Sequence, residues 1–309
     1  MEPPVSDDAA VGASGAPDAT DDEDDSADVP SILSLNPGRR ATERYWLYYT
    51  PVWGAVTGVL MLGGFVEHWG DLACMIYGVA LAAGAVAGPL LIRVPEERGV
   101  PLHRRAGVKL ALSVVGLSFA LNYSQTQFFF DVLHMHFGFG TRINIHNNPV
   151  FLYFLTVAYF STYCVLCCAT FRALRRIAAR RRSRVIAAVA YVIAPMAMAL
   201  LEALLNANPF THTLFCYDDM RLVLTFGTLC YGMSFVFALP MWMAIDDTPG
   251  RNVRASSVVV WLFAAVYAQT LTLDFARHHL APHVTTVLTE HNGLRDVGGA
   301  SCLQPIVLP

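Results

Sequence analysis

A single carboxylate interrupts a long apolar segment in the middle of the chain. Glu202 lies near the end of the run 185–206, VIAAVAYVIAPMAMALLEALLN, which is long enough to cross a bilayer. Placing a charged carboxylate in hydrocarbon costs roughly 3 kcal/mol or more, so an acid at such a position suggests proton transfer or ligand binding. Pro195, about two turns earlier, is expected to interrupt the helix and open space beside Glu202.

Polar groups in two other apolar segments are expected at the depth of Glu202. They lie at residues 122–127 and 269–274, and the alternating direction of successive spans places both groups in the non-cytoplasmic half of the membrane. Asn148 and Asp219 lie in loops on the same side. One interpretation is a shared pocket, and the other is that these groups only hydrogen-bond to one another across helices.

Aromatic residues are frequent at the same level. Tyr123, Tyr217 and Tyr267 are among them, together with the phenylalanine run 128–130. At a membrane interface such residues commonly form an aromatic belt. Around a pocket, their ring faces can instead stabilise a cation.

The composition predicts the elements that must position these residues. The chain has 309 residues, of which 55% are hydrophobic and 15% charged, which is typical of a polytopic membrane protein rather than a soluble domain. We predict an all-α membrane helix bundle with about seven transmembrane helices. The predicted spans are 46–66, 72–92, 108–130, 150–171, 185–206, 221–245 and 256–276. Gly54-x-x-x-Gly58 and Gly84-x-x-x-Gly88 are expected to allow close helix contact.

The N-terminal segment differs from the rest of the chain. Residues 1–30 contain ten Asp or Glu residues, no Lys or Arg and no aromatic residue. Such a segment cannot bury enough apolar surface to fold, so we expect 1–35 to be a disordered acidic tail and 36–309 to be the transmembrane domain. The tail lacks the basic and apolar regions of a signal peptide.

The basic residues predict the orientation. Most of the 21 Lys and Arg residues precede the first span or lie in the loops on the same side, and residues 172–184 alone contain seven arginines. The positive-inside rule then places the N-terminus in the cytoplasm. This argues against a seven-helix receptor, which has its N-terminus outside. The arginine run is interpreted as a topology anchor, so we expect a lipid bilayer and no nucleic acid as a partner.

Several different short motifs follow one another along the chain in a specific order. They are Asn36-Pro37, the LYYTPVW segment at 47–53, Asn122-Tyr123, Phe128-Phe129-Phe130, Asn147-Asn148-Pro149, Leu174-Arg175-Arg176, Glu202, Asp219, Leu273-Asp274 with Arg277, and Cys302-Leu303-Gln304. Through them the chain resembles the cycloeucalenol cycloisomerase family of plant sterol isomerases over about residues 36–305. The family pattern has His where this chain has Gln127, so the resemblance does not imply a proton donor there.

The resemblance implies an enzyme that opens the 9β,19-cyclopropane ring of a sterol. It would convert cycloeucalenol to obtusifoliol by protonation at C19 and loss of the proton at C8. An isomerisation needs no redox cofactor, so we expect neither cofactor nor metal. The location would be the endoplasmic reticulum membrane in a eukaryote or the cytoplasmic membrane in a bacterium. The alternatives are an isomerase similar to sterol Δ8–Δ7 isomerases and a non-enzymatic membrane protein that binds or transports sterols.

The chemistry requires one proton donor and one acceptor. Our hypothesis assigns these roles to Glu202 and Asp274, without deciding which donates, and has Tyr123 and Asn122 orient them. Asp219 is a third candidate, or the anchor for the sterol hydroxyl. The other residues expected to bind substrate are Tyr217, Asn148, Gln127 and Tyr267.

Overall fold

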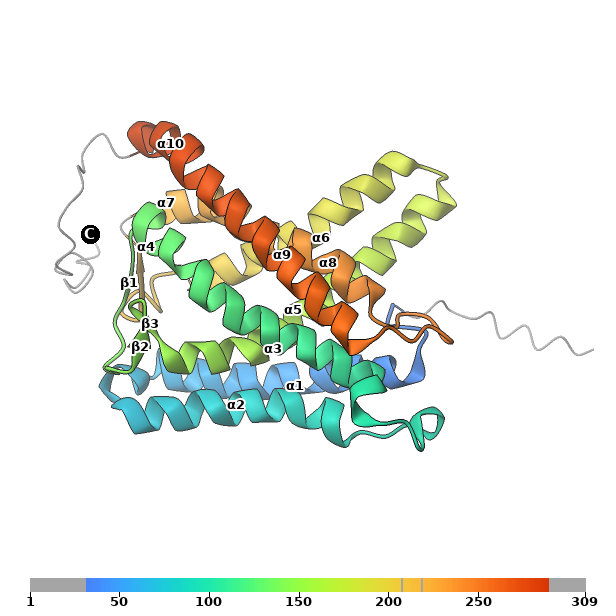
Figure 1. Ribbon diagram of the computed structural model, residues 1–309. Helices are drawn as coiled ribbons and strands as arrows, with labels where there is room; N and C mark the ends of the chain where they lie inside the picture. The colour runs from blue at the N-terminus through green and yellow to red at the C-terminus, as the bar shows by residue number, and fades with distance from the viewer. Residues whose placement is uncertain (1–31, 207, 218, 289–309) are drawn as a thin grey trace, which may run out of the picture. The chain divides into compact units, whose positions relative to one another are not determined.

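The computed structural model describes residues 32–288 except 207 and 218, and it confirms the predicted polytopic helical bundle. The helices, shown in Figure 1, are α1 Pro37–Leu62, α2 Asp71–Leu91, α3 Ala106–Ser124, α4 Thr126–Leu133, α5 Val150–Arg180, α6 Arg184–Asn206, α7 Met220–Leu222, α8 Thr228–Ala244, α9 Ala255–Phe275 and α10 Ala281–Leu288. Two π-helical turns, η4 Val223–Gly227 and η5 Ala276–Leu280, join α7 to α8 and α9 to α10. Short 3₁₀ turns occupy Val66–His68, Pro95–Glu97 and Leu102–Arg104.

Six segments of the described chain are helices long and apolar enough to cross a membrane. They are Asp71–Leu91, Ala106–Leu133, Val150–Arg180, Arg184–Asn206, Met220–Ala244 and Ala255–Val284. The first predicted span, 46–66, falls on α1, which is long enough but is not counted among them. Its tyrosines and tryptophans make it less apolar than the other six. Residues 1–31 of the predicted tail, and the Cys302 motif, lie outside the described residues.

The residues just before α1 contact the bundle. Ser34 is buried, and its backbone N–H donates to Glu43 Oε2 at 2.8 Å. Its hydroxyl donates to the carbonyl oxygen of Asp247 at 2.9 Å. These bonds tie the residues just before α1 to the bundle, although the composition assigned them to the tail.

Helix α5 is at the centre of the packing, where it contacts α1, α2, α3, α6 and α8. Beside it, α1 and α2 approach closely because α2 has glycines where α1 has aromatic residues. The Tyr45 hydroxyl donates to Gly84 O at 2.6 Å, and a Cβ added at Gly84 would meet the Tyr49 hydroxyl oxygen at 2.4 Å. Gly54 and Gly58 face open space in the described chain. The prediction of close helix contact at this motif is therefore wrong.

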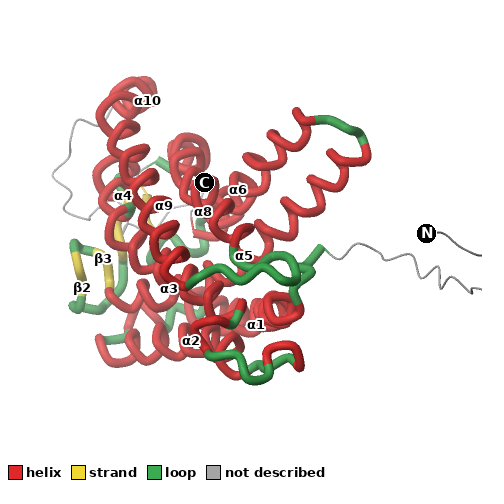
Figure 2. The backbone as a smooth tube through the Cα atoms, turned by 45° about the vertical axis from the view of Figure 1, so that its right-hand side comes forward, coloured by secondary structure: helices red, strands yellow, loops and turns green. Residues whose placement is uncertain are grey.

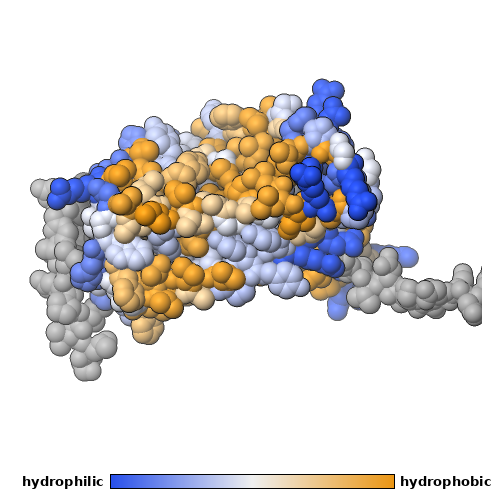
Figure 3. Space-filling model, turned by 90° about the horizontal axis from the view of Figure 1, so that it is seen from below, coloured by the Kyte–Doolittle hydropathy of each residue, from blue (hydrophilic) through white to orange (hydrophobic). Residues whose placement is uncertain are grey.

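The helices at the periphery are α6 and α9, which are the least buried of the six apolar spans. Their exposed apolar side chains suit contact with lipid. Figure 3 shows apolar residues over much of the middle of one face, with strongly hydrophilic residues toward its ends. This distribution is typical of a bundle that spans a bilayer.

Two short antiparallel ribbons lie at one end of the bundle (Figure 1). One pairs β1 Met135–Phe137 with β4 Phe215–Tyr217, and the other pairs β2 Asn144–Ile145 with β3 Asn148–Pro149. Side chains alternate between the faces of a strand, so the two outer residues of β1 and of β4 share one face of their ribbon. That face forms one wall of the cavity described below.

A cluster of buried ion pairs ties elements together at the other end. Glu43 Oε1 lies 2.8 Å from both Arg39 Nε and Arg172 Nη2, and Arg172 also pairs with Asp247. The cluster joins α1, α5 and the loop before α9. Arg172 therefore has a structural role. The turn between α5 and α6 carries other, exposed arginines, and it extends beyond the neighbouring helices (Figure 2).

Candidate functional site

A cavity lies between α3, α4, α5, α6 and α8, and the β1–β4 ribbon forms one of its walls. Its wall is mainly apolar and aromatic. Phe129, Phe137, Phe160 and Phe215 contribute rings, and polar groups come from Asn122, Gln125, Thr126, Thr156, Glu202, Asn206 and the tyrosines 159, 217 and 231. A concave and largely apolar wall with some polar groups is typical of a small-molecule site.

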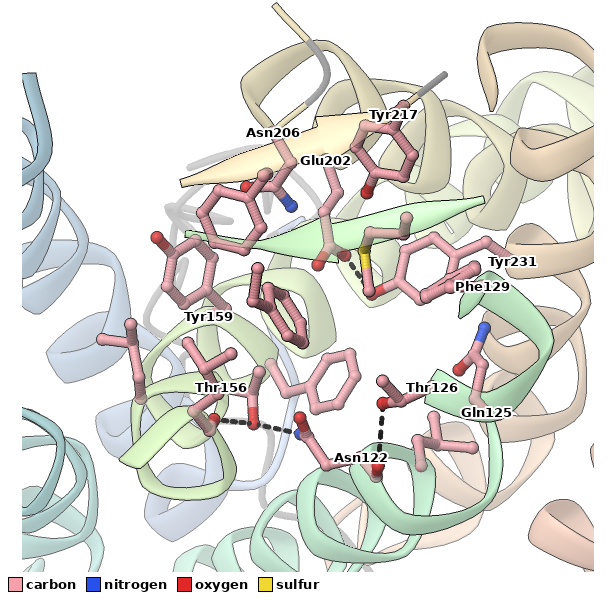
Figure 4. Close-up of a pocket in the computed structure, with 17 residues that line it drawn as sticks. Asn122, Gln125, Thr126, Phe129, Thr156, Tyr159, Glu202, Asn206, Tyr217 and Tyr231 are labelled. Atoms are coloured by element: carbon pink, nitrogen blue, oxygen red, sulfur yellow. Dashed lines mark hydrogen bonds between the residues drawn. The ribbon is translucent and has the colours of Figure 1, made fainter. Parts of the chain in front are cut away.

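Glu202 is the only carboxylate among the described residues that line this cavity. Its side chain points from α6 toward α8, where it accepts a hydrogen bond from the Tyr231 hydroxyl (Figure 4). The Tyr231 ring is held by Phe129 and Phe235, with centroid separations of 5.8 and 5.1 Å. The carboxyl group therefore has a fixed partner inside an aromatic enclosure.

The junction of α3 and α4 brings another polar group to the same cavity. Asn122 Nδ2 donates to Thr156 Oγ1 at 2.7 Å. The Asn122 carbonyl oxygen accepts from Thr126 Oγ1 at 2.8 Å and from Asn148 Nδ2 at 2.9 Å. It is therefore bonded by side chains at the junction of the two helices. The predicted shared pocket is therefore found for α3 and α6, but no residue of the third predicted group, 269–274, lines it. Asn148 is buried behind the wall and does not line the cavity.

The structure does not bring Asp274 to Glu202. The Asp274 side chain is 68% exposed on α9, and it lies 3.4 Å from His278. The buried side of α9 at this level includes Gln269 and Leu273. One further residue along a helix turns the side chain by about 100°, which directs Asp274 outward. The prediction that the carboxylates of Glu202 and Asp274 act as a pair in one site is therefore wrong.

Three more candidates lie away from the cavity. Tyr123 is 54% exposed and its hydroxyl lies 3.2 Å from His146 Nε2, while Tyr267 is 67% exposed on α9. Gln127 Nε2 donates to the His146 carbonyl oxygen at 2.8 Å. None of the three is placed to touch a molecule in the cavity.

The two candidates from the segment before α8 have different positions. Asp219 caps α7, where its Oδ1 accepts from the backbone N–H groups of Arg221 at 2.8 Å and Leu222 at 3.1 Å, and it does not line the cavity. Tyr217, on β4, does line it. Burial raises the pKa of the Tyr217 phenol above its ordinary value, so this group remains a neutral hydrogen-bond donor.

Several lining residues had no assigned role in the sequence prediction. Gln125 is spaced i+3 from Asn122, and Phe129 is spaced i+7, so helical periodicity could have identified Gln125 as facing the same side. Tyr159 and Tyr231 lie within apolar runs of α5 and α8. Only the packing of those helices directs their hydroxyl groups inward.

Cysteine does not form a metal site in the described part of the chain. Cys164, Cys167 and Cys168 are free and buried in α5, where they pack as small side chains. Across residues 32–288, without 207 and 218, no group of three or more His, Cys, Asp or Glu residues is arranged to hold a metal ion.

Fold and site together define a multi-pass helical membrane protein with an internal cavity suited to an apolar molecule and one carboxyl group facing it. Comparison with known proteins adds a particular relative. The chain is 29% identical over 266 residues to cycloeucalenol cycloisomerase of Arabidopsis thaliana, covering 82% of this chain and 91% of that protein. The resemblance seen in the motifs is thereby confirmed. No family model and no solved structure matches the chain.

Proposed function

We propose that this chain is an isomerase that opens the 9β,19-cyclopropane ring of a sterol, with cycloeucalenol as substrate and obtusifoliol as product. The observation that carries the proposal is the position of Glu202, which is the one carboxyl group among the described residues that line a largely apolar and aromatic cavity. The similarity to a cycloisomerase over most of the chain supports the same reaction.

In the proposed mechanism, Glu202 begins as the neutral acid. It gives its proton to C19 as the C9–C19 bond breaks, so C19 becomes a methyl group on C10 and positive charge develops at C9. The aromatic rings of the cavity face this charge and offer no strong nucleophile to trap it.

The second step returns the proton. C8 and C19 are both bonded to C9, so one carboxyl group can reach both atoms. The Glu202 carboxylate removes the proton from C8, the C8=C9 double bond forms, and the neutral acid is restored. Tyr231 holds the carboxyl group in place through its hydrogen bond in both steps. This route uses one carboxyl group instead of the two that were expected.

The product formed from a cyclopropyl sterol tests the reaction. The purified protein in lipid vesicles is incubated with cycloeucalenol in D₂O, and the sterols are analysed by mass spectrometry. We expect obtusifoliol with deuterium at the C19 methyl group, because the carboxyl proton exchanges with solvent between turnovers. A Δ7 product would instead indicate a different isomerase, and unchanged sterol that remains bound would indicate a binding protein.

Orientation is part of the proposal. We place the N-terminus in the cytoplasm, on the side of the arginine-rich turn between α5 and α6. The cavity then lies in the opposite half of the membrane. Protease protection of an N-terminal tag in sealed vesicles tests this placement.

A further inference from the structure

The turn between α5 and α6 and the adjacent helix ends carry a patch of exposed arginines. None of their side chains forms an ion pair among the described residues. The only acidic residue between positions 150 and 206 is Glu202, which follows Arg184 by about five helical turns. The positive charge of the patch therefore has no counter-charge nearby along these helices. This arginine patch consists of Arg175, Arg180, Arg181, Arg182 and Arg184.

Other basic residues at this end of the bundle are neutralised by buried acids. Arg39 and Arg172 share Glu43, and Lys109 pairs with Asp246. These charges join elements of the fold, so their role is structural. The arginine patch has no such partner in the described part of the chain, so packing within the bundle does not explain it.

An ordered backbone supports the arginine patch. The Arg181 N–H donates to Ile177 O at 3.0 Å and the Ser183 N–H donates to Ala178 O at 3.0 Å, which ends α5. Ser183 Oγ then accepts from the Ile186 N–H at 3.2 Å and caps α6. Both helices therefore continue up to a short turn, and this end of the hairpin extends beyond the neighbouring helices (Figures 1 and 2).

Apolar side chains are exposed among the arginines. Ile177 is 46% exposed and Val185 is 71% exposed. From Val185 the exposed apolar surface continues along α6 through Val189 and Ile193, at the spacing of one helix face. A soluble polyanion such as a nucleic acid would leave Ile177 and Val185 uncovered. A bilayer covers them and places the arginines at the level of the headgroups.

We propose that the arginine patch binds anionic phospholipids at the membrane surface. Its planar guanidinium groups are suited to the phosphate and carboxylate oxygens of the headgroups, while Ile177 and Val185 contact the acyl chains. Basic residues next to a membrane span attract anionic lipids. Orientation by the positive-inside rule depends only on how many basic residues lie on one side, whereas lipid binding also needs them unpaired and close together, as they are here.

Photo-crosslinking tests where anionic lipid binds. The full-length protein is reconstituted in phosphatidylcholine vesicles that contain a trace of phosphatidylserine or of phosphatidylcholine with a photoreactive acyl chain. Cross-linked peptides are identified by mass spectrometry after chymotryptic digestion, because this protease does not cut at arginine.

Two variants remove the same number of charges from different places. The patch variant combines Arg180→Gln, Arg181→Gln and Arg184→Gln. The control variant combines Arg93→Gln, Arg98→Gln and Arg104→Gln, which are exposed positions between α2 and α3. All six side chains are exposed, so both variants should fold, which circular dichroism checks.

In the wild-type protein we expect phosphatidylserine to label residues 177–193 about fivefold more than phosphatidylcholine does, which matches the contribution of one basic residue near an anionic surface. The patch variant should lower this ratio to less than about twofold, and the control variant should retain it. Equal labelling by the two lipids in the wild-type protein, or the same ratio in both variants, would overturn the proposal.

Salt provides a second measurement. Raising the salt concentration from about 0.1 M to about 1 M shortens the screening distance from about 10 Å to about 3 Å, so the wild-type ratio should fall. A ratio that does not change with salt would show that the arginine charges do not cause the preference. Neither measurement needs a sterol, so the proposed reaction and this inference can fail independently of each other.

Discussion

Replacing Glu202 with Gln is the sharpest test of the proposed chemistry. The variant keeps the shape of the side chain and an oxygen that can accept the Tyr231 hydrogen bond, but it has no proton that it can transfer and return. The cavity should therefore keep its form and its affinity for sterol. Only the proton-transfer steps should be affected.

The expected loss follows from the composition of the cavity wall. A positioned general acid or base contributes about 10²–10⁴-fold to rate, which is roughly 3–5.5 kcal/mol of barrier. No other carboxyl group lies among the described lining residues, so no neighbour can take over the role. We therefore expect a loss in the upper part of that range, about 1000-fold or more in turnover.

The assay measures obtusifoliol formed from cycloeucalenol by equal amounts of protein in vesicles. Asp274→Asn is the matched control, because the Asp274 carboxyl group is 68% exposed and lies outside the cavity. The activity of this variant should stay within about twofold of wild type. If Glu202→Gln retained more than about a tenth of the activity, Glu202 would not be the proton-transfer group. A comparable loss in Asp274→Asn would show that the Asp274 carboxyl group takes part in the reaction.

Three other changes have defined outcomes. Tyr231→Phe removes the hydrogen bond to the Glu202 carboxyl group and should lower turnover about tenfold without loss of sterol binding, as measured by obtusifoliol formation and by competition with a fluorescent sterol. Glu43→Ala removes the carboxylate shared by two buried arginines, which keep only Asp247 as a partner, and should cost about 3 kcal/mol of stability, whereas exposed Glu96→Ala should cost less than about 0.5 kcal/mol in denaturant unfolding. Gly84→Val should lower the thermal midpoint, because the added side chain collides with Tyr49, while Gly58→Val, which faces open space, should not.

The spans were predictable because apolar runs of sufficient length have few alternatives to membrane helices. The predicted span 185–206 became α6 Arg184–Asn206, and 221–245 became the helical segment Met220–Ala244. The largest differences are at α1, which begins at Pro37 instead of residue 46, and at α5, which continues to Arg180, beyond the predicted end at residue 171. Hydropathy marks the apolar part of a helix, and arginines beyond it can continue the same helix in a polar environment.

The candidate site was only partly predictable. Glu202 stood out because an acid in an apolar run is expensive, and Asn122 was found with it because the two lie at the same depth. Depth does not determine which way a side chain points around its helix. Asp274 shares the depth and faces outward, whereas Gln125 and Tyr231 face the cavity.

The sequence by itself therefore determined the class of the protein, the positions of its spans and the resemblance to a sterol isomerase, because these depend on composition, length and order along the chain. The tertiary structure decided which side chains meet. It placed Glu202 in the cavity wall as the one carboxyl group among the described lining residues, paired it with Tyr231 from another helix, and left Asp274 on the outside. That choice depends on the rotation of each helix about its own axis, which is set by packing against its neighbours.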